Sequence, residues 1–234
     1  MIRSLIKALG YEVIKSKRSP NFESHLKNIL EQGQFDVVLD VGANKGQFAQ
    51  AVRKAGFTGQ ILSFEPVAST FASLQKQSQA DSMWKVFQLA LGEVKEQKKI
   101  NVFDASDFSS LLKPSEFGKE TFDQLKTMRE ELIEINTLDN FLLENRLSEY
   151  KKILLKMDTQ GFDLSVFRGA KKTLACIRAM VSEVSFAPIY DGMPNYHAAL
   201  AEYESHGFAI TGLFPVTRKS NQAIIEMDCV MVKE

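Results

Sequence analysis

The chain has 234 residues, of which 44% are hydrophobic and 25% are charged, as in ordinary globular domains. Its 29 basic and 29 acidic residues give zero formal net charge, so no global field favours a nucleic-acid partner. Cys176 and Cys229 lie in apolar segments without metal-ligand spacing, which favours reduced thiols in a cytoplasmic protein. The length suits one domain with a sizeable core.

The first 35 residues predict an N-terminal helical extension. Residues 1–18 carry apolar side chains at helical spacing among lysines and arginines, and a short helix follows over 22–30. The apolar stretch is too interrupted for a signal peptide or a membrane span. It suits an amphipathic helix packed on the domain, or one that lies on the inner face of an anionic membrane.

From residue 36 to 234, predicted strands alternate with predicted helices, which indicates a doubly wound, mostly parallel sheet with seven strands. The strands are expected at 37–41, 60–64, 85–89, 153–157, 180–184, 208–214 and 228–232. The helices are expected at 46–55, 68–77, from 138 to about 143, from 163 through Leu174 and Ile177, and at 196–206. An insertion over about 98–137 contains two more strands. The last two strands of the sheet are joined without a helix, which predicts an antiparallel edge.

A glycine turn follows the first strand, in the run Asp40-Val41-Gly42-Ala43-Asn44-Lys45-Gly46. At Gly42 the chain must turn and a ligand must approach the backbone, so a Cβ there is expected to collide with the ligand. Glu65 ends the second strand, and an acid about 20 residues after such a turn typically accepts hydrogen bonds from ribose hydroxyls.

These motifs favour an adenosine ligand without phosphates. Asn44 replaces the second glycine of the dinucleotide fingerprint, and no P-loop occurs. S-adenosylmethionine (SAM) is therefore the first candidate cofactor. The alternative is that Gly42 and Gly46 only turn the chain.

Further candidates for SAM binding lie at neighbouring strand ends. The Asp40 carboxylate suits the methionine ammonium, directly or through water. Ala43 and Asn44 belong to the same turn, and Ala90 and Leu91 are placed to offer backbone groups to adenine. The insertion contains Ser109 and Ser110. Their hydroxyls suit a polar acceptor or the SAM carboxylate, unless the two residues simply form a polar turn.

Several segments together resemble the FkbM-type methyltransferases. They are 39–46, Phe64-Glu65-Pro66, 90–92, 109–111, 137–139, Leu155-Lys156-Met157-Asp158-Thr159-Gln160-Gly161 and 167–170, within residues 36 to 214. The resemblance implies the fold of class I SAM methyltransferases and O-methylation of hydroxyls on sugars, polyketides and related metabolites. The family usually has Val-Glu where this chain has Thr159-Gln160, which leaves the position polar but removes a charge.

Methyl transfer to a hydroxyl requires alignment and a general base. Asp158, after the strand at 153–157, suits a base, a contact to the SAM methionine, or a residue that holds the following turn. Glu183 lies inside an apolar strand, where a charge is costly unless it is used or paired, so it is expected as a second acid or a ligand of the acceptor hydroxyl. His197 is an alternative base, or simply a solvated or capping residue.

No metal site is assigned, because Asp158 and Glu183 lack a recognisable third ligand. The acceptor is expected to be a sugar, glycan or glycosylated metabolite in a pocket formed by residues 101–135 and 186–197. Two other functions remain open: a NAD-dependent oxidoreductase on a similar sheet, and a non-catalytic SAM-fold partner held at a membrane by residues 1–18. The first is disfavoured by Asn44, and the second gains no support from Asp40 and Glu65.

Overall fold

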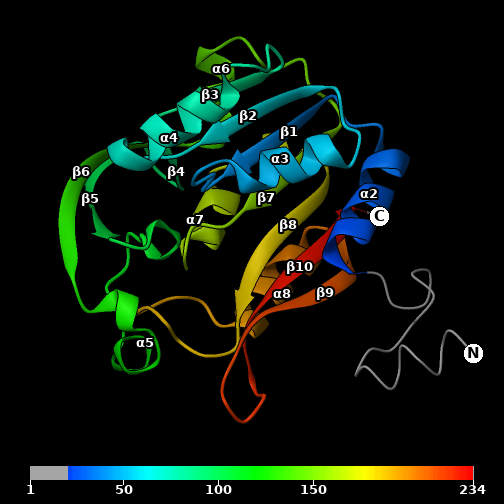
Figure 1. The fold of residues 1–234 in the computed structure, drawn as a ribbon. Coiled ribbons are helices and arrows are strands. Elements are labelled where there is room, and N and C mark those ends of the chain that lie inside the picture. The colour runs from blue at the N-terminus through cyan, green and yellow to red at the C-terminus, as the bar shows by residue number, and fades with distance from the viewer. Residues whose placement is uncertain (1–20, 234) are drawn as a thin grey trace, which may run out of the picture.

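The computed structural model describes residues 21–233, which form a seven-stranded sheet in the order β3-β2-β1-β7-β8-β10-β9 (Figure 1). β10 is antiparallel to both of its neighbours, and all other neighbouring pairs are parallel. The predicted doubly wound sheet with an antiparallel edge is therefore confirmed. Its strands are β1 (Val37–Val41), β2 (Gln60–Phe64), β3 (Trp84–Phe87), β7 (Ile153–Met157), β8 (Ile177–Ser185), β9 (Phe208–Arg218) and β10 (Ile224–Lys233).

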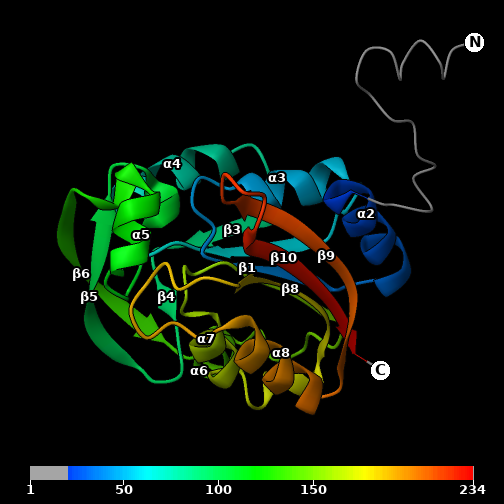
Figure 2. The same ribbon diagram turned by 90° about the horizontal axis from the view of Figure 1, so that it is seen from below.

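Helices cover both faces of this sheet, as Figure 2 shows. One layer contains α2 (Phe22–Gly33), α3 (Gln47–Lys54) and α4 (Ala68–Ser78); the other contains α6 (Leu138–Glu144), α7 (Asp163–Arg168) and α8 (Tyr196–Ser205). Alternate strand residues enter separate cores, so Val38 packs in the α2–α3 layer and Leu39 in the α6–α8 layer. Burial on both faces explains why the central strands read as continuous apolar runs.

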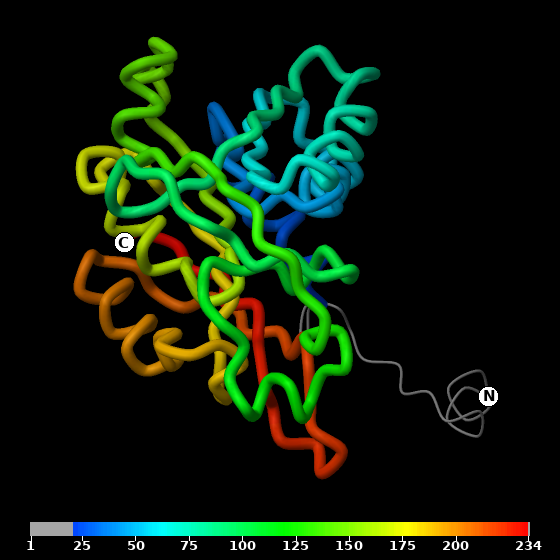
Figure 3. Tube along the Cα trace, turned by 90° about the vertical axis from the view of Figure 1, so that its left-hand side faces the viewer, coloured from blue at the N-terminus to red at the C-terminus, as the bar shows by residue number. Residues whose placement is uncertain are grey.

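The insertion forms a second, three-stranded sheet in the order β4-β6-β5. In Figure 3, in which the left-hand side of Figure 1 faces the viewer, this green part of the chain crosses the front of the molecule. β5 and β6 pair antiparallel, and the segments between them include two short 3-10 turns and a short helix. The elements are β4 (Ala90–Leu91), β5 (Glu96–Phe103), η1 (Ser106–Phe108), α5 (Glu116–Thr121), η2 (Asp123–Leu125) and β6 (Met128–Asn136).

The helix predicted from residue 163 is shorter than expected. α7 ends at Arg168, η3 (Thr173–Ala175) follows, and Ile177 begins β8 beside Ile153. Gly169 follows α7 at a close approach of two segments, since a Cβ on it would lie 1.9 Å from the carbonyl oxygen of Gly92. The prediction that Leu174 and Ile177 continue the helix was wrong, since a buried turn and strand can place apolar residues at helical spacing.

α2 packs on the domain. The Asn21 side chain caps it by accepting a hydrogen bond from the Ser24 N–H (2.9 Å), and the Phe22 ring meets Phe214 of β9 edge-on at 5.6 Å. The helix predicted over residues 1–18 lies outside the described residues. Within residues 21–233, no helix is both long enough and apolar enough to cross a membrane.

Candidate active site

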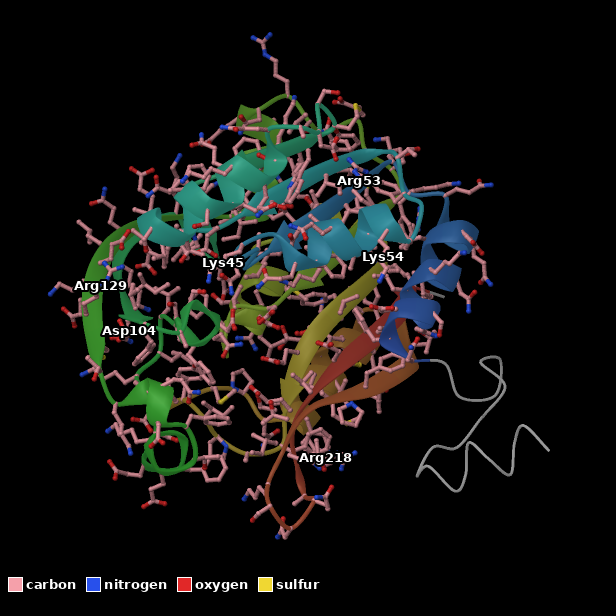
Figure 4. All side chains as sticks on the ribbon, viewed as in Figure 1. Lys45, Arg53, Lys54, Asp104, Arg129 and Arg218 are labelled. Atoms are coloured by element: carbon pink, nitrogen blue, oxygen red, sulfur yellow. The ribbon has the colours of Figure 1, made fainter. Side chains whose placement is uncertain are left out.

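A cavity of about 590 Å³ lies where β1, β2, β7 and β8 end, a size typical of small-molecule sites. Parallel strands end at one edge of a sheet, and the order reverses between β1 and β7, where such sheets bind ligands. In Figure 4, Lys45 marks the end of α3 that faces this region, and Asp104 and Arg129 mark the insertion.

The turn after β1 is shaped by the chain that leaves β7. Gly42 has φ +73°, and a Cβ on it would lie 1.8 Å from the Asp158 carbonyl oxygen. Position 42 requires glycine, as predicted. The immediate reason is this contact with the Asp158 backbone rather than contact with a ligand. Gly46 has φ +92°, caps α3, and would place a Cβ 2.6 Å from the Trp84 ring.

Glu65 is 7% exposed and lines the cavity next to this turn. One carboxylate oxygen accepts the Asn44 N–H and the other accepts the Val67 N–H, both at 3.0 Å. Burial raises the pKa of Glu65 to about 7. Each oxygen keeps a lone pair for a hydroxyl donor, so the placement matches the ribose contact expected for Glu65.

Asn44 joins the turn to the insertion. Its side-chain amide donates to Asp107, and its amide oxygen accepts the Ser106 hydroxyl at 2.9 Å. Its φ of +47° is left-handed, a conformation that asparagine adopts more readily than most residues. Asn44 and Ala43 therefore line the cavity as predicted, and Asn44 also positions η1.

The pKa of Glu65 predicts how cofactor binding depends on pH. The folded-state pKa of Glu65 is raised, so the ligand-free fold loses stability as the pH rises through this pKa and Glu65 ionises. Ribose hydroxyls donate hydrogen bonds to the ionised carboxylate, so a bound ligand favours the ionised form. We expect S-adenosylhomocysteine affinity to rise about tenfold from pH 6 to pH 8, as the ionised fraction rises from about 0.1 to 0.9. Calorimetric titration of wild type, Glu65→Gln and the control Asp107→Asn measures this. A slope that persists in Glu65→Gln would assign it to other groups.

Asp40 lies below the cavity instead of lining it. Its side chain is fully buried; one oxygen accepts the Ser63 hydroxyl (3.0 Å) and the other lies 3.2 Å from the Lys156 ammonium. The contact predicted between Asp40 and a methionine ammonium is thus replaced by a contact with a protein ammonium. Sequence reasoning missed Lys156, although a lysine within the apolar strand Ile153–Met157 is as unusual as the acid at 183.

Gln160 holds Asp158 and Glu183 together. Its side-chain nitrogen donates to Asp158 Oδ1 and to Glu183 Oε2, each at 3.1 Å. The Tyr190 hydroxyl lies 3.0 Å from Gln160 Oε1 and 2.8 Å from the Phe108 carbonyl oxygen. An amide donates to two carboxylates without changing its charge, which a glutamate cannot do, so the Thr-Gln variant has a structural role here.

Asp158 reaches the cavity with a side chain that is 42% exposed. The turn after it is held by another acid, because Asp163 accepts the Thr159 N–H at 2.8 Å and the Ser182 hydroxyl at 2.9 Å. The structure therefore contradicts the alternative in which Asp158 serves only to hold the turn. Its carboxylate remains available to a ligand.

Two acids of β10 complete a cluster around Glu183. Asp228 pairs in register with Glu183, and Glu226 lies two residues earlier on the same face of the strand. Burial, together with repulsion from Asp158, raises the pKa of Glu183 well above its usual range and that of Asp228 to about 6. Burial likewise raises the pKa of Glu226 to about 7. Sequence reasoning missed both β10 acids, although their alternation with apolar residues was a usable signal.

The structure separates the remaining candidates. Ala90 and Leu91 of β4 line the cavity, as does Ser109, whose buried hydroxyl has no partner among the described residues. Ser110 faces away and donates to the Gln160 carbonyl oxygen at 2.7 Å. His197 is exposed on α8, stacks on Tyr196 and does not line the cavity, so its predicted role as base is wrong.

The walls of the cavity differ in part from the predicted acceptor pocket. The insertion contributes Ile100, residues 106–109 and Leu111, whereas no described residue of 112–135 or 186–197 lines the cavity. The opposite wall comes from Phe22 of α2, Phe48 of α3 and Val216 of β9. Elements distant in sequence form this wall, and no local pattern reports their proximity.

No metal site accompanies these acids. Across residues 21–233, no group of three or more His, Cys, Asp or Glu side chains is arranged to bind a metal ion. Among the described residues that line the cavity, Lys156 is the single basic one, facing seven acids: Glu23, Glu65, Asp107, Asp158, Glu183, Glu226 and Asp228.

The strand order, the antiparallel β10 and the glycine turn followed by Glu65 define a class I SAM-dependent methyltransferase. The sequence matches the methyltransferase FkbM domain over residues 40–210. The chain belongs to this family, as its motifs predicted, and its cofactor is SAM. The family match also decides against the NAD-dependent alternative.

Similar solved structures include magnesium protoporphyrin IX methyltransferase from Synechocystis PCC 6803 with bound SAM. It is 8% identical, with a TM-score of 0.47 over 100% of this chain and 95% of that one. An rRNA methylase from Streptococcus thermophilus is 8% identical (TM-score 0.48, 95% and 99% covered). An uncharacterised protein from Listeria monocytogenes serotype 4b is 12% identical (TM-score 0.49, 94% and 69% covered). No curated protein matches the sequence.

Proposed function

We propose that the protein transfers a methyl group from SAM to a hydroxyl of a sugar, glycan or glycosylated metabolite, with Asp158 as the general base. One observation carries the proposal: the exposed carboxylate of Asp158 is fixed by Gln160 in the cavity that Glu65 also lines. A base and a ribose acceptor in one cavity are what methyl transfer to an alcohol requires.

The cofactor end of the cavity offers groups that suit each part of SAM. Glu65 suits the ribose hydroxyls, and Ala90 and Leu91 suit the adenine. The partnerless hydroxyl of Ser109 suits the methionine carboxylate, because a buried hydroxyl without a partner is costly. When bound, SAM supplies a methyl group already activated by a sulfonium.

The acceptor end offers groups that suit a hydroxyl. An alcohol is a weak nucleophile until its proton is removed, so the Asp158 carboxylate, acting as the general base, accepts that proton as the methyl moves. Burial raises the pKa of Glu183 well above its usual range, so its carboxyl group suits a hydrogen bond to the acceptor hydroxyl. Gln160 keeps the two carboxyl groups at a fixed separation.

The charge of the cavity supports an acceptor without phosphates. Seven acidic lining residues face the single ammonium of Lys156, so a nucleic-acid backbone would be repelled. A hydroxyl-rich sugar, by contrast, is bound by carboxylates and amides through hydrogen bonds. A non-catalytic partner would not need a base fixed beside the cofactor site, so the same observation disfavours that alternative.

The product of a labelling reaction tests the proposal. The protein is incubated with SAM that carries a trideuterated methyl group and with a panel of mono- and oligosaccharides. We expect one labelled methyl per acceptor, attached to oxygen, by mass spectrometry and NMR of the product. A labelled methyl on nitrogen or carbon would contradict O-methyl transfer. A parallel reaction with Asp158→Asn reports whether the transfer depends on this site.

A further inference from the structure

Lys156 is the one buried cation at the reaction centre within the described residues. Its side chain is 9% exposed, and its ammonium donates to the Gly42 carbonyl oxygen at 2.7 Å. The ammonium lies 3.2 Å from Asp40 Oδ1 and 3.6 Å from Asp158 Oδ2. It therefore contacts the cofactor turn, a buried carboxylate and the proposed base at the same time.

We propose that Lys156 is a positioning residue for methyl transfer: its ammonium, anchored on Asp40, contacts the Asp158 carboxylate and stabilises its charge beside the glycine turn. The inference rests on the proposed role of Asp158 as the base. In this arrangement Asp40 is the counter-ion of Lys156.

The anchor of Lys156 is a buried polar chain that crosses three strands. The Trp84 indole donates to the Ser63 hydroxyl at 2.9 Å, and this hydroxyl donates to Asp40 Oδ2 at 3.0 Å. Asp40 is thus held on one side by Ser63 and on the other by Lys156. A buried carboxylate with both partners fixed has one orientation, so the ammonium is fixed as well.

The charge of Lys156 is retained despite burial. Burial alone lowers the pKa of a lysine, but the carboxylates of Asp40 and Asp158 raise the pKa of Lys156 above its usual range. One neighbouring carboxylate would be enough to balance the charge. The second contact, to Asp158 in the cavity, is what a purely structural ion pair would not need.

Asp158 also has acidic neighbours. The titratable groups around it, besides Lys156, are Glu183 of β8, Glu226 and Asp228 of β10, Asp163 of α7 and Tyr190. Like charges favour protonation of a carboxyl group, and a contacting ammonium opposes it. Lys156 therefore distinguishes Asp158 from the other acids of the cluster, because its ammonium contacts Asp158 directly.

The test compares Asp40→Asn with the double variant Asp40→Asn/Lys156→Met. Both lack the buried Asp40 charge, so the double variant leaves no unpaired carboxylate and the pair differs only at Lys156. Aspartate side chains are labelled with ¹³C at the carboxyl carbon and titrated by NMR, with Asp158→Asn identifying the resonance. We expect the titration midpoint of the Asp158 carboxyl to lie roughly 1 pH unit higher in the double variant.

Lys233→Met is the matched control. Its ammonium also donates to a backbone carbonyl, that of Leu174 (2.8 Å), and lies over a phenylalanine ring, that of Phe208 (5.1 Å), but it does not line the cavity. We expect this variant to leave the Asp158 titration unchanged. Thermal unfolding and calorimetry with S-adenosylhomocysteine report whether each variant is folded.

If Asp40→Asn and Asp40→Asn/Lys156→Met are both folded and show the same titration midpoint for the Asp158 carboxyl, the proposed role of Lys156 is overturned. This readout needs no acceptor and no turnover, so it is independent of the proposed reaction. If the midpoint moves but Asp158→Asn still transfers methyl groups, the proposed base fails while the electrostatic link stands. A midpoint that moves equally in Lys233→Met would also overturn the inference, because the change would then be nonspecific.

Discussion

Asp158→Asn is expected to lower kcat for methyl transfer by roughly 10²- to 10⁴-fold, the contribution typical of a general base. The substitution keeps the shape of the side chain and its contact with Gln160, but it removes the group that accepts the proton. Affinity for S-adenosylhomocysteine should change little, because the hydrogen bonds that hold Glu65 at the glycine turn do not involve the Asp158 carboxylate. Steady-state kinetics and calorimetry measure the two effects separately.

Glu23→Gln is the control for this prediction. Glu23 also lines the cavity, but it lies on α2 and pairs with Lys54 on the surface at 3.7 Å, away from Gln160. Its loss should leave kcat within about twofold of wild type, as for a weak surface ion pair. If Asp158→Asn remained active while Glu183→Gln did not, the base would be Glu183.

Gly42→Ala is expected to cost about 3 kcal/mol of unfolding free energy and to abolish S-adenosylhomocysteine binding. The left-handed φ costs an alanine about 1–2 kcal/mol, and overpacking against a neighbour adds about 1–3 kcal/mol. Here the neighbour is the backbone carbonyl of Asp158, 1.8 Å from the new Cβ, which cannot rotate away. Denaturant titration with calorimetry tests both effects.

Gly56→Ala is the matched control, since Gly56 has φ +100° with nothing within 4 Å of a new Cβ. It should show only the backbone strain, about 1–2 kcal/mol, and unchanged cofactor affinity. Equal losses in the two variants would show that the contact between the β1 turn and Asp158 contributes nothing.

The sequence predicted the sheet well where burial on two faces leaves a simple pattern. The bounds expected for β1, β2 and β7 match the structure, because each is an apolar run that a polar residue or a turn ends. The end of α7 was missed because Leu174 of η3 and Ile177 of β8 continue its apolar spacing. The pairing of Ile177 with Ile153 joins segments distant in sequence and leaves no local signal.

The site was predicted in outline from strand ends alone. Glu65 and Asp158 line the cavity, because each follows a strand whose end lies at the ligand edge of the sheet. Asp40 does not, because it pairs with Ser63 and Lys156, two residues before Glu65 and Asp158 on their strands, and so lies deeper in the sheet. How far below the ligand edge a side chain lies depends on this pairing, which a motif does not specify.

The position of β10 makes the two parts of the site depend on different parts of the chain. The glycine turn and Glu65 belong to strands formed early in the chain, and they pair with each other directly. Glu226 and Asp228 reach Glu183 only after β10 enters between β8 and β9. The position of Glu65 therefore rests on the pairing of two strands close in sequence, whereas the acidic cluster around Glu183 requires the last strand of the chain.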